Sequence, residues 1–186
     1  MARTHHLLTV WNPSYSDDAL DAHLSVLLEW ARRRDVREAE PDEVYVWWGR
    51  IRSKNREGHL PHHERVLTID AQTESGDETH LYLTDYRSLY VAELGEVTDD
   101  DVREAEGERA HMPAYYDGHA VDFWFRLFDV RRLVTDDTPA VIEELRALRN
   151  TGYHDRPVSL YGGEWSICRS WSSASRRSAG SRTATR

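Results

Sequence analysis

The sequence predicts an α+β fold: a small, curved, mostly antiparallel β-sheet or pseudo-barrel with helices packed on it. Its strand-like segments are rich in aromatic residues and do not alternate strictly with helical segments. Strict alternation would indicate a doubly wound parallel sheet, so its absence favours an antiparallel arrangement. Two of the strand-like segments are also separated by a four-residue turn signal, which predicts a hairpin.

The N-terminal part predicts a strand, a helix and a second strand in that order. A short apolar strand is expected over residues 6–10. Apolar residues then recur at helical spacing over 20–31, Ser16 can cap the start of this helix, and arginines occupy its last turn, where cations are favourable. A proline–aspartate pair breaks the chain before a second strand over 44–51.

The rest of the chain predicts a hairpin, a long strand and a final helix. Leucine and tyrosine alternate on both sides of a turn at 85–88, and aromatic residues alternate over 121–134. Thr138 and Pro139 can open the last helix as N-cap and first residue. The other expected elements are a weaker helix after Pro61, a solvated loop or short helix over 99–108, and a strand over 156–162.

Composition restricts the function classes. The 186 residues suit one domain, no apolar run approaches the roughly 20 residues of a membrane helix, and no signal peptide is recognisable at the N-terminus. A single cysteine, Cys168, excludes an internal disulfide, so a cytoplasmic protein is expected. The net charge of -9 argues against a protein that coats nucleic acid non-specifically, but it leaves room for a local basic site.

The C-terminal end differs from the rest of the chain. Residues 1–163 are expected to form a single α+β domain, whereas 164–186 contain seven serines and five arginines. Such a tail is typical of a disordered arm. The codons for EWSICRSW, read in a shifted frame, also permit an apolar strand after the Gly-Gly turn. The tail is therefore either disordered or the frameshifted end of the gene, and no chemistry is assigned to it.

The stretch VYVWWGRIRSKNR carries the first candidate site. Trp47 and Trp48 are adjacent on a strand, so their rings point to opposite faces, and at most one can be an exposed platform for a base. Cations that can hold phosphate and polar groups that can read a base edge follow in the same loop. They are Arg50, Arg52, Lys54 and Arg56, and Ser53 and Asn55. The alternative is a strand packed on both faces that ends in a solvated basic turn.

A second candidate site is the tip of the predicted hairpin. Tyr86, Arg87 and Ser88 combine an aromatic ring, a cation and a hydroxyl on a loop held by two strands, where binding groups commonly lie. The alternative is a structural turn in which Asp85 hydrogen-bonds its own backbone.

Two further clusters have weaker signals. The segment HLPHHE offers His59, His62, His63 and Glu64, but no second ligand pair completes a metal site, so an exposed helix start is the favoured interpretation. Tyr115, Tyr116 and Asp117 with Trp124 are interpreted as packing rather than as a cage for a base. No catalytic motif, nucleotide-binding loop or credible cysteine nucleophile occurs, so neither a cofactor nor a catalytic residue is expected.

The order of elements resembles the PUA-like superfamily, especially its EVE and ASCH-type branch. An aromatic strand leads to a polar loop (VYVWWGRIRSKNR), a hairpin follows (HLYLTDYRSLYVAELGEV), and a later strand closes the barrel (DFWFRLFDVRRL). This resemblance covers roughly residues 5–163. It implies a pseudo-barrel that binds nucleic acid, often with a modified or flipped base in an aromatic pocket. In bacteria such modules frequently accompany restriction or other defence nucleases.

The leading hypothesis is a non-catalytic reader of DNA or RNA that recognises a modified base. One alternative is a metal-dependent nuclease that uses His62, His63, Glu64 and Asp85. Another is a protein–protein interaction module of a defence or regulatory complex that uses the acidic segment 99–108.

Overall fold

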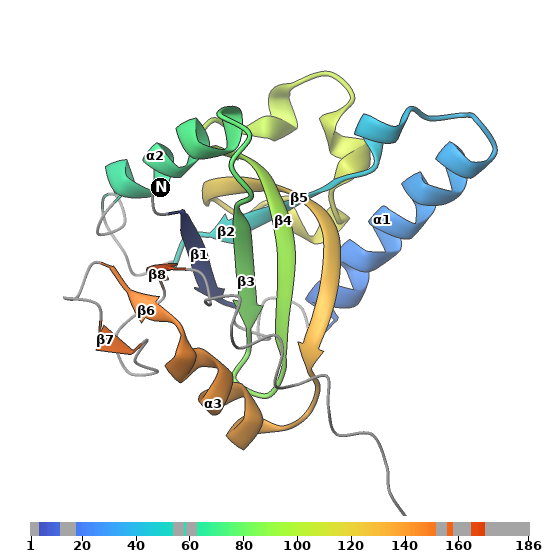
Figure 1. The fold of residues 1–186 in the computed structure, drawn as a ribbon. Helices are drawn as coiled ribbons and strands as arrows, with labels where there is room; N and C mark the ends of the chain where they lie inside the picture. Colours follow the sequence, from blue (N-terminus) through green and yellow to red (C-terminus); the bar gives the residue numbers. More distant parts are fainter. Residues whose placement is uncertain are drawn as a thin grey trace, which may run out of the picture.

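The computed structural model of the chain describes residues 4–11, 18–53, 58, 63–151, 156–157 and 165–169. These residues form an α+β fold, as predicted, in which α-helices pack on one curved and mostly antiparallel sheet (Figure 1). The α-helices are α1 (Ala19–Asp35), α2 (His63–Glu74) and α3 (Thr138–Ala147). The strands are β1 (His5–Val10), β2 (Val46–Ile51), β3 (His80–Thr84), β4 (Leu89–Thr98), β5 (Val121–Val134), β6 (Arg149–Asn150), β7 (Arg156–Pro157) and β8 (Trp165–Arg169).

The strands lie in the order β2-β5-β4-β3-β1-β8-β6-β7. Only the β1–β3 pair is parallel among the described strands. The register between β4 and β5 shifts at three places, and such irregularities bend the paired strands. Figure 1 shows the result, a β5 that arches over the sheet.

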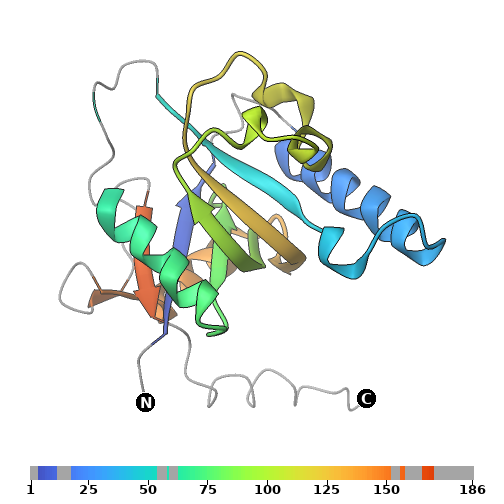
Figure 2. The same ribbon diagram turned by 90° about the horizontal axis from the view of Figure 1, so that it is seen from above.

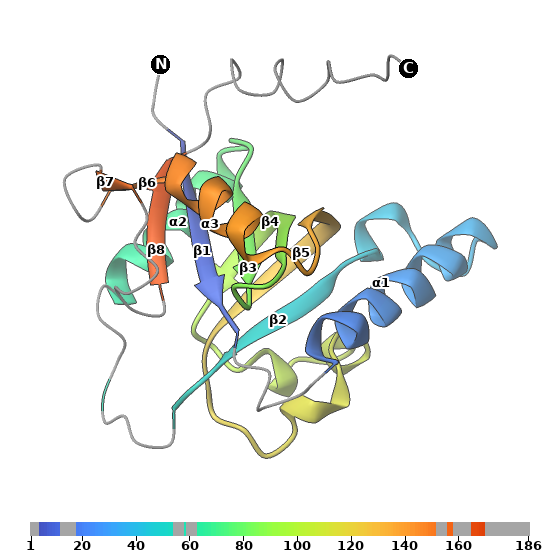
Figure 3. The same cartoon turned by 90° about the horizontal axis from the view of Figure 1, so that it is seen from below.

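The two faces of β5 follow the predicted alternation. Phe123, Phe125 and Leu127 are fully buried in the main core, to which α1 and α2 also contribute (Figure 2). Trp124 points to the opposite face and joins a separate cluster with Trp47. On that opposite face α3 covers β1 and β3, where Val141, Leu145 and Leu148 pack on Leu8 and Tyr82 (Figure 3).

Short 3-10 helices connect the main elements. They are η1 (Pro41–Glu43), η2 (Val102–Glu104), η3 (Glu108–His111) and η4 (Ala114–Tyr116). Segment 99–108 was expected to be a solvated loop or a short helix, and the short-helix form is confirmed by η2 and the start of η3.

A continuous stack of planar groups holds the C-terminal half of α1 against η3. The His111 ring lies 3.9 Å from Trp30 and 3.9 Å from Tyr45, nearly parallel to both. The Arg33 guanidinium covers the outer face of Trp30, and that of Arg126 covers Tyr45. His111 Nδ1 also lies 3.4 Å from the carbonyl oxygen of Tyr45, to which it can donate. The stack therefore joins α1, η3, the start of β2 and β5.

Most predicted elements are confirmed, and the differences concern helix ends and the C-terminal segment. The first helix was expected to start after Ser16, which lies outside the described residues, but α1 begins at Ala19 with Asp18 as its N-cap. The helix expected after Pro61 extends further than predicted, to Glu74. Its apolar pattern is weak because only Val66 and Ile69 of α2 are buried. Asp137 rather than Thr138 caps α3, since its Oδ1 accepts a hydrogen bond of 3.0 Å from the Ala140 backbone N–H. β8 lies within segment 164–186, where no strand was expected. Among the helices that the structure describes, none has the length and apolar character of a membrane span.

Candidate nucleic-acid site

Trp47 and Trp48 lie on opposite faces of β2, as predicted, but both are buried, with 3 % and 4 % of their surface exposed. Trp47 belongs to the cluster around Trp124, and its indole Nε1 donates a 2.6 Å hydrogen bond to Glu108 Oε2. The same oxygen accepts a 2.9 Å bond from the Tyr45 hydroxyl. Trp47 is therefore a core residue that anchors η3. One of the two tryptophans was expected to enter the core; Trp47 does so in this cluster, and Trp48 belongs to the main core.

Trp48 is not an exposed platform either, because its ring is stacked on His23 of α1. The two ring centroids are 4.3 Å apart, with an angle of 30° between the planes. His23 Nδ1 lies 2.5 Å from the Ala19 carbonyl oxygen, so this nitrogen carries the proton and donates. Nε2 then accepts from the Tyr116 hydroxyl at 3.0 Å. The hydroxyl in turn accepts a 2.8 Å bond from the Gly49 backbone N–H.

This hydrogen-bonded chain is uncharged near neutral pH. Burial lowers the pKa of His23 to about 4, although hydrogen bonds to the backbone of Ala19 and Trp47 oppose the shift. Burial also raises the pKa of the Tyr116 hydroxyl well above its usual value. One face of the Trp48 ring is thus covered by His23, which is neutral and hydrogen-bonded through both ring nitrogens. Gly49 is required beside it, because a Cβ there would lie 2.8 Å from ring atoms of both Trp124 and Tyr116.

The exposed margin of Trp48 opens into a small aromatic hollow at the end of β1. Trp11 meets Trp48 edge to face at 6.0 Å between ring centroids, and Tyr115 of η4 completes the wall. The half-buried Arg50 also lines the hollow, and its Nη1 donates to the Ile51 carbonyl oxygen at 3.2 Å. The volume is about 30 Å³, which suits about two water molecules. A base can therefore occupy the hollow only if one of the rings moves.

The remaining residues of the basic loop divide into two groups. Arg52 Nε donates a 2.8 Å hydrogen bond to Asp122 Oδ1, and the Asp122 side chain is only 2 % exposed. Because this buried carboxylate needs a counter-charge, Arg52 serves as its ion-pair partner, while the Arg52 side chain itself is 41 % exposed. Ser53 is half-buried at the end of the described segment. Lys54, Asn55 and Arg56 lie outside the described residues.

The hairpin tip is a structural turn. Asp85 Oδ1 accepts hydrogen bonds from the backbone N–H groups of Arg87 (2.9 Å) and Ser88 (2.7 Å). The Tyr86 backbone adopts the left-handed conformation, with φ of 69°. Arg87 forms an exposed 3.1 Å ion pair with Asp136, so the tip contacts the connection between β5 and α3. The interpretation in which Asp85 bonds its own turn is confirmed, and the tip does not line the hollow.

The histidine segment is described only in part. His63 Nε2 lies 2.9 Å from Asp99 Oδ2, and its ring packs on Phe123. Glu64 is exposed at the start of α2, while His59 and His62 lie outside the described residues. Within the described ranges, no three His, Cys, Asp or Glu side chains come together as ligands for a metal ion.

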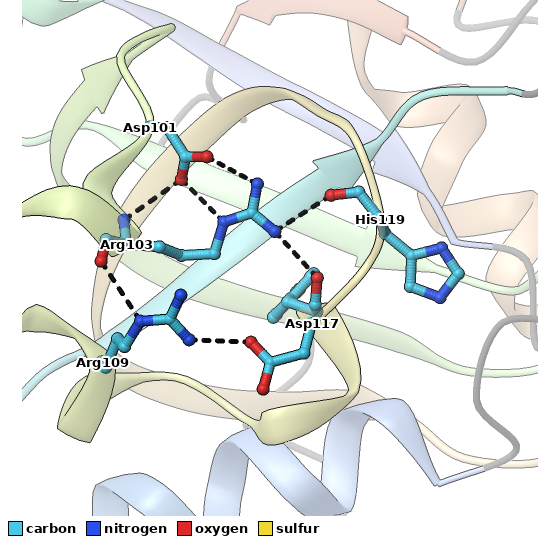
Figure 4. A network of polar contacts seen from close by, with 6 residues as sticks. Asp101, Arg103, Arg109, Asp117 and His119 are labelled. Atoms are coloured by element: carbon cyan, nitrogen blue, oxygen red, sulfur yellow. Dashed lines mark hydrogen bonds and ion pairs between the residues drawn. The ribbon is translucent and has the colours of Figure 1, made fainter.

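Arginine side chains link the acidic segment to the backbone next to Tyr115 (Figure 4). Arg103 forms two hydrogen bonds with the Asp101 carboxylate, and its Nη1 donates to the carbonyl oxygens of Tyr116 and His119 at 2.9 and 3.0 Å. Arg109 pairs with Asp117 at 2.9 Å. Arginines of the same region thus partly neutralise the acidic side chains. Arg103 also connects η2 to the end of η4 and to the segment that follows it.

The sequence did not single out Trp11, and for Tyr115 it favoured packing over a cage for a base. Trp11 directly follows an apolar strand, so its position at a strand end was visible in the sequence. Its contact with Trp48 depends on the placement of β1 relative to β2, which local patterns do not define.

No protein-family model matches the chain, and no curated protein matches it either. The function is therefore inferred from the geometry of the hollow.

Proposed function

We propose that the protein binds nucleic acid without cleaving it, with one base held between Trp11 and Trp48. The observation that carries this proposal is the convergence of three aromatic rings and one guanidinium on one hollow, from the end of β1, from β2 and from η4. Stacking of a base on an aromatic ring contributes about 1 to 3 kcal/mol and tolerates any sequence. Arg50 at the rim is suited to a phosphate next to that base.

The hollow admits a base by displacement of Trp11. Trp48 is fixed by His23 and by the main core, whereas Trp11 is only partly buried and meets its neighbours edge to face or tilted. A ring that rotates away from Trp48 exposes the stacking surface. Aromatic walls of this kind replace the stacking that a base loses when it leaves a strand or duplex.

The basic loop extends the proposed site. Residues Lys54 and Arg56 follow β2 directly in sequence, so they start within a few residues of Arg50. With a net charge of -9, most of the surface repels phosphate, and binding concentrates at this loop. The proposal extends, through the PUA-like resemblance, to a modified base and to a bacterial, cytoplasmic defence system with a partner nuclease.

The experiment is a fluorescence-anisotropy titration of the full chain with labelled oligonucleotides, with and without Mg²⁺. The panel contains unmodified DNA, DNA with 5-methylcytosine, 5-hydroxymethylcytosine or N6-methyladenine, and RNA. We expect a preference of about tenfold, equal to about 1.4 kcal/mol, for one modified base, without cleavage.

Two variants separate this site from general charge effects. Trp11→Ala should abolish the preference while the thermal unfolding transition remains. Arg50→Gln should weaken binding to every oligonucleotide, whereas the matched control Arg146→Gln, an exposed cation on α3, should have no effect. Binding to none of the panel would refute the proposal. Mg²⁺-dependent cleavage would replace it with the nuclease alternative.

A further inference from the structure

A second, larger groove lies on the opposite face of the sheet, beside α3. It has a volume of about 440 Å³ and is lined by residues of β3, β4 and β5 together with Glu78, which precedes β3. No described helix covers this part of the sheet, although Tyr82 and Val91 at its margin also contact the α3 cluster. The groove is therefore separate from the aromatic hollow, and a ligand bound there does not depend on nucleic-acid binding.

The groove combines an apolar and aromatic surface with carboxylates. Tyr82 and Val91 supply apolar surface, and Leu133, which is 46 % exposed, adds more. Around it lie the carboxylates of Glu78, Glu93 and Asp129.

These carboxylates differ in how they are paired. Arg131 forms an ion pair with Asp129, and Glu78 lies 3.2 Å from His80 Nε2. Glu93, which stands opposite His80 in the β3–β4 ladder, is exposed and makes no ion pair with any described residue. Glu93 is thus the carboxylate that an incoming cation meets first.

The carboxylates of Glu78, Glu93 and Asp129 all interact electrostatically with Arg131. Asp129 contributes most to raising the pKa of the Arg131 guanidinium, and the negative charges of Glu93 and Glu78 contribute to the same shift. The positive charge of Arg131 is therefore outnumbered by the negative charges of Asp129, Glu93 and Glu78, and the groove remains electronegative.

We propose that this groove binds an arginine side chain of a partner peptide, with Glu93 as the acceptor for the guanidinium. The planar guanidinium forms paired hydrogen bonds with a carboxylate, which an ammonium group does less well. The methylene groups of the arginine side chain can cover Val91 and Leu133. Phosphate-bearing ligands are disfavoured by the same carboxylates.

The test measures binding of the full chain to a fluorescent peptide with two arginines separated by glycine and serine residues. The comparison peptide replaces both arginines with citrulline, which keeps the shape and removes the charge. We expect the arginine peptide to bind at least about fivefold more tightly, because a charged hydrogen-bonded pair is worth more than a neutral one.

Variants distinguish the groove from the general attraction of an acidic protein for a basic peptide. Glu93→Gln should weaken binding about fivefold. Glu38→Gln makes the same charge change at an exposed site after α1 and should leave binding unchanged. Leu133→Ala should weaken binding severalfold without a charge change. Equal losses in Glu93→Gln and Glu38→Gln, or equal binding of the citrulline peptide, would overturn the proposal.

Discussion

His23 and His6 are buried as neutral imidazoles, and each couples folding to protonation. Burial is the main cause that lowers the pKa of both residues to about 4, and for His6 the neighbouring His80 and His5 add to the effect. His6 Nδ1 accepts a hydrogen bond from the His80 backbone N–H at 3.1 Å, which also requires the neutral ring. In the unfolded chain both residues would titrate near 6.5.

Protonation of these residues should therefore destabilise the fold in mild acid. The unfolded state binds more protons than the folded state between pH 6.5 and pH 4, so the contribution is fully present above pH 6.5 and is lost as the pH falls. Each histidine accounts for roughly 3 kcal/mol over this window. We expect urea-unfolding measurements to give a lower free energy of unfolding at pH 5 than at pH 7.5. His23→Gln should show a shallower pH dependence, and an unchanged one would contradict this assignment.

Single residues also mark the limit of sequence reasoning at the candidate site. The alternation along β2 correctly placed Trp47 and Trp48 on opposite faces. It could not show that both faces are covered, because the covering groups, Glu108 and His23, come from segments far away in sequence. The same limit applies to Arg52, whose partner Asp122 lies on β5.

At the level of elements, accuracy followed the strength of the local pattern. The strand over 121–134 was predicted with its observed bounds, because aromatic and aliphatic residues occupy most positions from 121 to 128 on both faces. The helix α2 was underestimated, since it buries only Val66 and Ile69 and has few apolar positions to reveal it. The acidic segment was expected to be a solvated loop or a short helix, and the local pattern did not reveal that Arg103 within it binds two backbone carbonyls outside the segment.

The connection between η2 and η4 can be tested with a matched pair of arginine variants. The Arg103 side chain is 15 % exposed and holds two carbonyl oxygens, whereas Arg109 is 61 % exposed and forms a surface ion pair and one longer hydrogen bond, of 3.3 Å, to the Arg103 carbonyl oxygen. Arg103→Ala should lower the free energy of unfolding by about 1 to 3 kcal/mol, because it leaves backbone acceptors unsatisfied. Arg109→Ala should cost about 1 kcal/mol or less.

Hydrogen exchange gives an independent measurement of the same connection. Arg103→Ala should increase amide exchange over residues 114–119, which carry the tyrosine wall of the hollow. Equal stability of the two variants, with equal exchange rates, would show that the arginine network in Figure 4 does not hold this segment.

For the whole molecule, the charge distribution predicts how nucleic-acid binding should depend on salt. The chain carries a net charge of -9, and the cations proposed to contact phosphate, Arg50, Lys54 and Arg56, lie within seven residues of the sequence. Contact with about three phosphates of a single strand corresponds to a slope of about -2 in a plot of log K against log salt.

Anisotropy titrations between about 50 and 200 mM salt measure this slope. Arg56→Gln should make it shallower by about 0.7 for single-stranded oligonucleotides. A slope of about -5 or steeper would indicate extensive contact with the phosphate backbone and would contradict a confined site.

The outer edge of β2 has a consequence for the behaviour of the protein at high concentration. β2 is the last strand of the sheet, and an exposed last strand is a template on which other chains polymerise. Here the Gly49 N–H is bonded by the Tyr116 hydroxyl, and the Tyr45 carbonyl lies within reach of His111. Side chains from η3 and η4 therefore occupy the positions that an added strand would need, which protects this edge from intermolecular β-aggregation.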